Sequence, residues 1–184
     1  MSQKTTRSCI SITYYDPITK VQSYTPATSM ILNLKKKHGD KYYYYRNQAL
    51  LEASTLIRDF LKESKNLKDL TFVPIPDSMC VYDYDRDSRM AEVMEHCNLD
   101  LDIQKILCFK SDSGKIHLSS SRRDAVSIKN NLSIHLPRLR LCKTKIVLLD
   151  DVLTTGAHFS ACKSLILEHR PEVEVFGLML AITR

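Results

Sequence analysis

Glycine is scarce in this chain, and its scarcity excludes two common nucleotide-binding motifs. Only four glycines occur in 184 residues: Gly39, Gly114, Gly156 and Gly177. They are too widely spaced to form the G-x-G-x-x-G fingerprint of dinucleotide-binding folds or the G-x-x-x-x-G-K-[ST] loop of Walker-type NTPases. We therefore expect neither of these two nucleotide sites.

Closely spaced cysteines and long apolar runs are missing as well. None of the six cysteines forms a C-x-x-C pair, and several lie within apolar segments, which predicts buried reduced thiols rather than a zinc site or disulfides. No apolar run approaches the ~20 residues that a membrane span requires. The polar residues 1–7 do not resemble a signal peptide. The expected protein is cytoplasmic and has no membrane partner. The cysteines are Cys9, Cys80, Cys97, Cys108, Cys142 and Cys162.

The overall composition is that of one globular domain. Apolar residues make up 43% and charged residues 26% of the chain, and 184 residues can bury a sizeable core. The net charge of +6 suits an anionic small ligand or a nucleic acid and does not separate the two, and we identify no aromatic-rich basic motif that would do so. Four consecutive tyrosines, residues 42–45, fit either a binding surface or packing of the N-terminal segment onto the next helix, and we predict packing.

Residue patterns predict an α/β fold with a mainly parallel, twisted sheet flanked by helices. Residues 9–15 and 21–24 fit a hairpin turned at Asp16 and Pro17, so residues 1–30 are predicted to form an N-terminal hairpin or hood and residues 31–184 the core of a single domain. From Asn47 onward, helical and strand patterns alternate, which favours parallel pairing. Strands are predicted over 70–75, 103–109, 146–149 and 173–182, and helices from Asn47, over 88–97 and over 157–168.

The most informative stretch begins with the apolar residues 146–149, which suit a buried parallel strand. Two carboxylates, Asp150 and Asp151, follow, and then Thr154, Thr155 and Gly156 lead into a predicted helix. Ligands bind outside the carboxyl ends of strands in open α/β sheets, and a helix start favours an anion such as phosphate. The competing interpretation is a surface turn followed by a helix cap.

A second acidic cluster, Asp83, Asp85 and Asp87, does not form a calcium loop. Ser88 stands where an EF-hand needs glycine, and Met94 stands where it needs glutamate. An aspartyl-phosphate phosphatase using this cluster stays as a remote alternative, because the acids do not close an apolar strand. A solvated loop is the simpler interpretation.

Residues 146–157 resemble the phosphoribosyl-pyrophosphate (PRPP) signature of type I phosphoribosyltransferases: four apolar residues, two acids, a spacer and Thr-Thr-Gly. The resemblance is greatest to the competence-protein ComF branch, through residues 72–76, the Leu34-Lys35 helix pattern and the polar stretch 110–123. The four-cysteine zinc module of that branch is absent. Its arginine–glycine stretch is only loosely echoed by Arg86 and Arg89, and His158 replaces the usual Thr or Ser.

The resemblance implies a role for each part of the site. Asp150 and Asp151 would be the catalytic acids and accept hydrogen bonds from the ribose hydroxyls. Thr154, Thr155, Gly156, Ala157 and His158 would cradle the 5′-phosphate. Pro76, Asp77 and Ser78 would carry the pyrophosphate loop. Lys110, Lys115, Arg122 and Arg123 would lie on a lid, with a solvated loop as the alternative for these four.

The implied activity is phosphoribosyl transfer, a glycosyltransferase reaction of nucleotide metabolism in which a nitrogenous small molecule displaces pyrophosphate from PRPP. Magnesium would be held mainly through PRPP, with no metal ion held by protein ligands alone. Thr154 stands where 6-oxopurine salvage enzymes usually carry Asp, and the lysine-rich loop of the orotate enzymes is not found, so the acceptor stays open. A homodimer is a further expectation. The alternatives are a non-catalytic PRPP-binding regulator and a ComF-like accessory protein of DNA uptake or processing.

Overall fold

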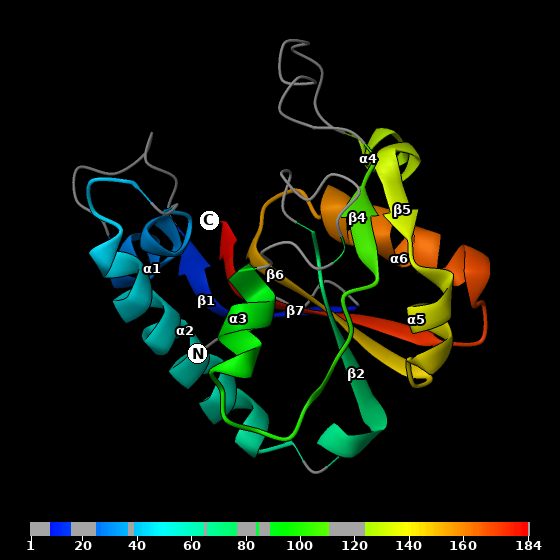
Figure 1. The fold of residues 1–184 in the computed structure, drawn as a ribbon, viewed down its shortest axis with the longest axis horizontal. Coiled ribbons are helices and arrows are strands. Elements are labelled where there is room, and N and C mark those ends of the chain that lie inside the picture. Colours follow the sequence, from blue (N-terminus) through cyan, green and yellow to red (C-terminus); the bar gives the residue numbers. More distant parts are fainter. Residues whose placement is uncertain are drawn as a thin grey trace.

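The computed structural model describes residues 8–15, 25–36, 39–64, 66–76, 84, 89–110 and 124–183. Its centre is a five-stranded sheet in which every neighbouring pair of strands is parallel, in the order β1-β7-β6-β2-β3 (Figure 1). The predicted α/β class, with a mainly parallel sheet flanked by helices, is confirmed. The strands are β1 (Cys9–Tyr15), β2 (Leu70–Pro74), β3 (Asp102–Ile103), β6 (Lys145–Leu153) and β7 (Glu174–Thr183).

Helices cover both faces of this sheet. On one face lie α1 (Pro26–Leu34), α2 (Tyr44–Lys62) and α3 (Arg89–Glu95), and on the other lies α6 (Ala157–His169). Beside α6 lie α4 (Ala125–Asn131), α5 (Leu136–Leu141) and a small antiparallel pair, β4 (Leu107–Phe109) with β5 (Leu132–Ile134). A short 3₁₀ helix, η2 (Leu67–Asp69), leads into β2.

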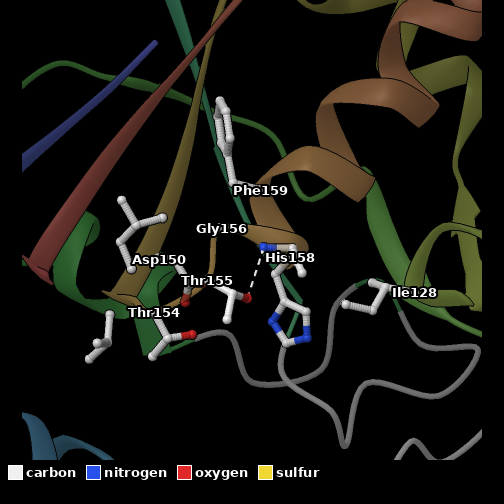
Figure 2. Close-up of a pocket in the computed structure, with 10 residues that line it drawn as sticks. Ile128, Asp150, Thr154, Thr155, Gly156, His158 and Phe159 are labelled. Atoms are coloured by element: carbon white, nitrogen blue, oxygen red, sulfur yellow. Dashed lines mark hydrogen bonds between the residues drawn. The ribbon is translucent and has the colours of Figure 1, made fainter. Parts of the chain in front are cut away.

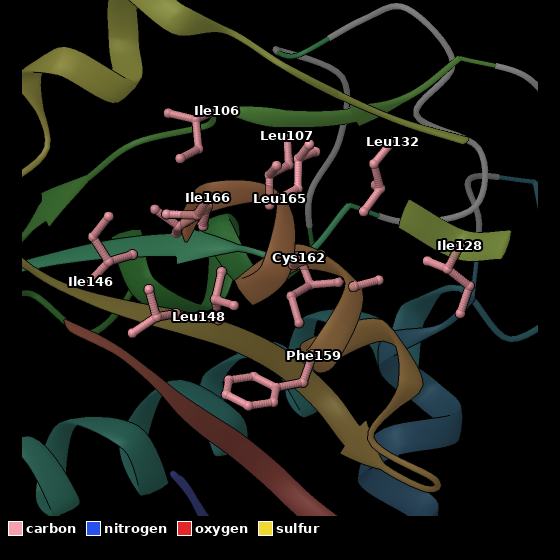
Figure 3. Packing of buried hydrophobic residues seen from close by; sticks show 14 of the residues in the cluster. Ile106, Leu107, Ile128, Leu132, Ile146, Leu148, Phe159, Cys162, Leu165 and Ile166 are labelled. Atoms are coloured by element: carbon pink, nitrogen blue, oxygen red, sulfur yellow. The ribbon is translucent and has the colours of Figure 1, made fainter. Parts of the chain in front are cut away.

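The alternating side chains of β6 fill two separate cores. Ile146 and Leu148 belong to the cluster that contains Cys162, Leu165 and Ile166 of α6 (Figure 3). Val147 and Leu149 belong to the cluster that contains Ala53 and Ile57 of α2. All four β6 residues are buried, which explains why residues 146–149 form a continuous apolar run rather than an alternating one.

Most predicted elements are present with small shifts at their ends. The sequence predicts an apolar face of Leu50, Ala53, Ile57, Phe60 and Leu61 on the helix after Asn47. Four of these residues are buried and Phe60 is partly buried. The residues predicted to point inward from the helices over 88–97 and 157–168 are also buried: Met90, Val93, Met94, Cys97, Ala161, Leu165 and Ile166. Helix α1 begins at Pro26, where Thr25 Oγ1 accepts a hydrogen bond from Thr28 N at 3.2 Å.

One prediction about strands is wrong, and another is tested only in part. Residues 103–109 do not form one strand: β3 pairs with β2, whereas β4 pairs antiparallel with β5 in a separate sheet. Residues 9–15 do form a strand, but it pairs parallel with β7 at the edge of the main sheet. Its predicted hairpin partner, residues 21–24, lies outside the described residues. The first strand of the expected hood therefore belongs to the core sheet.

The buried thiols agree with the sequence prediction. Cys9, Cys97, Cys108, Cys142 and Cys162 are free and buried, and Cys80 lies outside the described residues. Burial raises the pKa of Cys97 and of Cys142 to about 11, so little of the reactive thiolate form is present at neutral pH. Within the described part of the chain, no helix has the length and apolar character needed to cross a membrane.

Gly177 of β7 lies where neighbouring side chains leave no room for a Cβ atom. A Cβ atom at this position would lie 2.6 Å from Cys9 Sγ and 2.9 Å from Met179 Cε. We expect Gly177→Ala to lower the free energy of unfolding by about 1–3 kcal/mol through overpacking. Adding Cys9→Ala removes the nearest atom and should restore part of that loss, measured by urea denaturation. An equal loss in the single and double variants would contradict the assigned contact.

Candidate functional site

The site lies where the direction of strand order reverses. From β2 the chain moves outward to β3, then returns to β6 on the other side of β2 and continues to β7. The carboxyl ends of β2 and β6 therefore border a crevice of the kind in which open α/β sheets bind ligands. Ile75 N, just after β2, donates to Leu149 O of β6 at 2.8 Å, which holds the two strand ends together.

The predicted strand is longer than its apolar run. Strand β6 continues through Asp150 and Asp151 to Leu153, whereas its pairing with β2 ends at Leu149. Beyond Leu149, β7 alone remains as the pairing neighbour of β6 among the described strands. The two acids therefore lie within the strand, where successive side chains point to opposite faces.

Asp150 lies on the face of α6 and lines a pocket of about 250 Å³ (Figure 2). This volume is below the ~300–1,000 Å³ of pockets that enclose a whole ligand, so it matches a fragment such as a sugar phosphate. Asp150 and all five residues predicted to cradle the phosphate line the same space. The lining consists of Ile128, Asp150, Val152, Leu153, Thr154, Thr155, Gly156, Ala157, His158 and Phe159.

The Asp150 carboxyl is held in an environment that favours its neutral form. Burial is the main cause, the neighbouring charge of Asp151 adds to it, and together they raise the pKa of Asp150 to about 7. The hydrogen bond from Asp151 N to Asp150 Oδ1, at 2.8 Å, acts in the opposite direction. A carboxylate with this pKa is poised to bind a hydroxyl or a cation.

The start of α6 supplies the anion-binding half of the pocket. Gly156 precedes the helix with φ 76° and ψ 6°, a left-handed conformation that strains other residues, so the turn requires glycine. Thr155 Oγ1 accepts a hydrogen bond from Ala157 N at 3.3 Å, the dashed line in Figure 2. The first turn of α6 contains no acidic side chain, so the partial positive charge of the helix start is not cancelled there.

Asp151 lies on the opposite face and is outside this pocket lining. Its Oδ2 atom is 3.2 Å from Lys35 Nζ, just after α1, and 3.5 Å from Arg89 Nη2, at the start of α3. Only 9% of the Asp151 side chain is exposed, against 41% for Lys35 and 23% for Arg89. Asp151 therefore ties two helices to the central strand. The structure places Asp150 in the same pocket as residues 154–158, and it places Asp151 outside that pocket.

The other predicted site residues are placed only in part. Pro76 is buried two residues after the end of β2, while Asp77 and Ser78 lie outside the described residues. Lys110 follows β4 and is exposed, and its Nζ donates to Asn130 O at 3.1 Å. Lys115, Arg122 and Arg123 lie outside the described residues, so their role on a lid stays a prediction.

Sequence reasoning missed several members of the site. Ile128 comes from α4, a helix that was not predicted, and Phe159 follows the motif. Lys35 and Arg89 were noted in the sequence, but no local pattern shows that they converge on Asp151. The basic run beginning at Lys35 was the one sequence signal that could have indicated cations near the acids. No group of three or more His, Cys, Asp or Glu that could hold a metal ion occurs within the described part of the chain.

A second pocket, of about 310 Å³, lies near the amino ends of the strands. Cys9, Phe72, Val147 and Gly177 are among the residues that line it, and the described lining contains no charged side chain. It lacks the groups that a phosphorylated ligand needs. The smaller pocket at the start of α6 is therefore the candidate functional site.

Comparison with known proteins adds little to this geometry. No protein-family model matches the chain, and no curated protein is significantly similar to it. The chain is similar to two crystal structures of a hypoxanthine phosphoribosyltransferase from Staphylococcus aureus, one orthorhombic and one tetragonal. Each is 12% identical and covers 70% of this chain, which spans 60% of the solved chain, with TM-scores of 0.39 and 0.41. Both TM-scores are below 0.5, so the assignment of the site rests on its own residues.

We expect Asp150→Asn to stabilise the protein in a pH-dependent way. The raised pKa means that the folded state holds a proton that the unfolded state releases above the ordinary value of 3.8. Wild-type stability therefore falls as pH rises from about 4 to about 7, and the full cost persists above that range. The variant should gain about 1–2 kcal/mol at about pH 8, or roughly 2–8 °C in Tm, and little at about pH 4. A variant that is less stable than wild type at about pH 8 would contradict the raised pKa.

We expect Asp151→Asn to destabilise the protein at neutral pH. The substitution removes the negative charge that Lys35 and Arg89 share. The Arg89 guanidinium, the less exposed of the two cations, then loses its ion pair with residue 151. The expected loss is about 1–3 kcal/mol in urea denaturation, reduced because Lys35 remains partly solvated. Lys35→Met, at the more exposed partner, should cost less than about 1 kcal/mol. The reverse order of these two effects would show that Asp151 does not tie the helices to β6.

Proposed function

We propose that the chain is a phosphoribosyltransferase that binds PRPP with its ribose 5-phosphate in the pocket at the start of α6. The observation that carries this proposal is the convergence of Asp150 with residues 154–158 in one pocket of about 250 Å³. The pocket combines one carboxylate, two threonine hydroxyls and a helix start. A sugar phosphate needs this combination, because its diol donates hydrogen bonds and its phosphate accepts them.

The 5′-phosphate lies against the start of α6 in this proposal. Backbone N–H groups of the first helical turn and the Thr154 and Thr155 hydroxyls donate to its oxygens, and the helix dipole favours its charge. His158 lines the same pocket and can donate from its imidazole, in place of the Thr or Ser usual in similar motifs. The hydroxyl of Thr155 already faces the backbone of Ala157, so the turn is ordered before a ligand arrives.

The ribose hydroxyls contact Asp150, and Asp151 acts as a positioning residue. Asp150 is the acid that lines the pocket, whereas Asp151 is engaged by Lys35 and Arg89 on the other face. In this proposal the diol contacts one carboxylate, whereas the resemblance implied both. The ion pairs of Asp151 hold β6 in the register that presents Asp150.

In the same proposal, pyrophosphate would lie across the crevice, beyond β2, where Pro76 begins the predicted loop. The oxygen donors at the site suit magnesium, which prefers carboxylate and phosphate oxygens and retains water. Asp150 would hold the ion together with ligand oxygens, and magnesium would neutralise charge on the departing pyrophosphate. In the reaction, the bond between ribose C1 and the pyrophosphate oxygen breaks while a bond to a nitrogen of the acceptor forms. The acceptor nitrogen loses its proton to solvent or pyrophosphate.

The acceptor is an undefined nitrogenous small molecule. Thr154 occupies the position where 6-oxopurine enzymes usually carry Asp, which disfavours hypoxanthine and guanine. A non-catalytic PRPP-binding regulator is the second candidate. It is favoured by the engagement of Asp151 in ion pairs and by His158 in the phosphate pocket.

Titration calorimetry with PRPP and magnesium tests the proposed site. Wild type should bind, and Asp150→Asn and Thr155→Val should each weaken binding by about tenfold, since each removes a hydrogen bond to a charged or polar group. Affinity should also rise between about pH 6 and about pH 8, as Asp150 ionises and becomes a better acceptor.

The matched control is Asp69→Asn, an exposed acid of η2 just before β2, far along the strand from the site. It should leave PRPP affinity unchanged. Absence of binding to wild type, or equal loss in all three variants, would end the proposal. A pyrophosphate-release assay across bases and amines then separates the two candidates: turnover indicates a transferase, and binding without turnover indicates the regulator.

A further inference from the structure

The connection between α1 and α2, which is cyan in Figure 1, concentrates tyrosines and basic residues. Residues 35–46 contain five basic residues, one acidic residue and four consecutive tyrosines. The expectation from the sequence is that these tyrosines are packed. The structure contradicts this for Tyr42, Tyr44 and Tyr45, whose exposed fractions are 52%, 80% and 46%. An aromatic-rich basic motif therefore exists here, although the sequence analysis did not identify one.

The exposed rings and the lysines form one cluster. Lys36 Nζ lies 5.1 Å from the centroid of the Tyr42 ring and 5.3 Å from that of Tyr45, and Lys41 Nζ lies 5.4 Å from Tyr42. The Tyr44 and Tyr45 rings meet edge to face at 5.6 Å. We call Lys36, Lys41, Tyr42, Tyr44 and Tyr45 the tyrosine–lysine patch.

An ion pair to α3 holds Arg46, the residue that follows the tyrosine–lysine patch in the sequence. Arg46 is buried, and its Nη2 atom lies 2.7 Å from Glu92 Oε2 of α3, while its guanidinium lies 5.9 Å from the Tyr43 ring. This ion pair fixes the start of α2, so the exposed rings project from a rigid helix end. Internal packing accounts for Tyr43 and Arg46, but it does not account for Tyr44, which is 80% exposed.

We propose that the tyrosine–lysine patch binds single-stranded nucleic acid. Unstacked bases stack on the exposed tyrosine rings, and the Lys36 and Lys41 ammonium groups pair with the flanking phosphates. Aromatic rings interleaved with cations are the combination that sequence-tolerant single-strand binding uses. The basic surroundings favour a polyanion over a neutral apolar partner, and the net charge of +6 acts in the same direction.

The tyrosine–lysine patch shares no residue with the lining of the candidate pocket. Lys35, next to Lys36, pairs with Asp151 on the α1 face, whereas the pocket lies on the α6 face. The two ligands therefore contact different side chains. Nucleic-acid binding can be tested whether or not the chain binds PRPP.

Fluorescence anisotropy with a labelled oligothymidine of about 16 nucleotides tests the proposal, since this length covers the site sizes of single-strand binders. The full chain should bind the oligonucleotide and bind a duplex of the same length more weakly. The triple variant Tyr42→Ala, Tyr44→Ala and Tyr45→Ala should lose at least about tenfold in affinity. Lys36→Gln with Lys41→Gln should reduce the slope of log affinity against log salt by about 1.4.

Leu51→Ala is the matched control, because it removes an exposed apolar side chain, 60% exposed, from the same helix. It should bind as wild type does. Asp150→Asn should also keep oligonucleotide binding, which separates failure of this proposal from failure of the PRPP site. Circular dichroism checks that the triple variant is folded, and the lysine pair variant, which keeps all the rings, provides an independent result. The proposal is overturned if wild type does not bind, if duplex binds equally, or if the folded triple variant binds unchanged.

Discussion

The structure of the site depends on the pairing of β6 with β7 beyond the end of β2. This pairing keeps Asp150 and Asp151 in a strand, so adjacent carboxylates point to opposite faces of the sheet. One face is covered by α1 and α3, which supply Lys35 and Arg89, and the other opens onto the start of α6. Two acids that are neighbours in the sequence therefore meet different partners. A turn immediately after Leu149 would have left both acids near the same ligand.

Because of this separation, the two acids have different electrostatic surroundings. Asp151 is buried and compensated by two cations, whereas Asp150 makes no ion pair among the described residues and has a raised pKa. A fully compensated carboxylate stabilises the fold but binds a ligand weakly, because its existing partners must first be displaced. The uncompensated carboxylate costs stability and gains most from a ligand that donates hydrogen bonds. Asp150, the carboxylate that costs stability, is therefore the one that faces the pocket.

The sequence predicted the elements whose signals are local and not those decided by distant partners. The apolar residues 146–149 and the apolar face of α2 can be recognised from the spacing of apolar residues in the sequence. Gly156 indicates the turn. The end of β6, the break between β3 and β4, and the pairing of β1 with β7 depend on neighbouring strands far along the chain. Lys35 and Arg89 meet Asp151 only through the tertiary fold. The exposure of Tyr44 could not be read from its sequence, because packed and exposed tyrosine runs look alike.

The parallel pairing of Cys9 in β1 with Gly177 in β7 has a kinetic consequence. These two strands are far apart in the sequence, since β1 ends at Tyr15 and β7 begins at Glu174, so this edge of the sheet can close only after β7 has been synthesised. Until then β1 lacks β7, its one neighbour among the described strands. Such distant pairing raises the contact order and slows folding. The other edge of the sheet, formed by β2 and β3, joins segments much closer in sequence. We therefore expect the β2–β3 side to form early and the β1–β7 edge to close last.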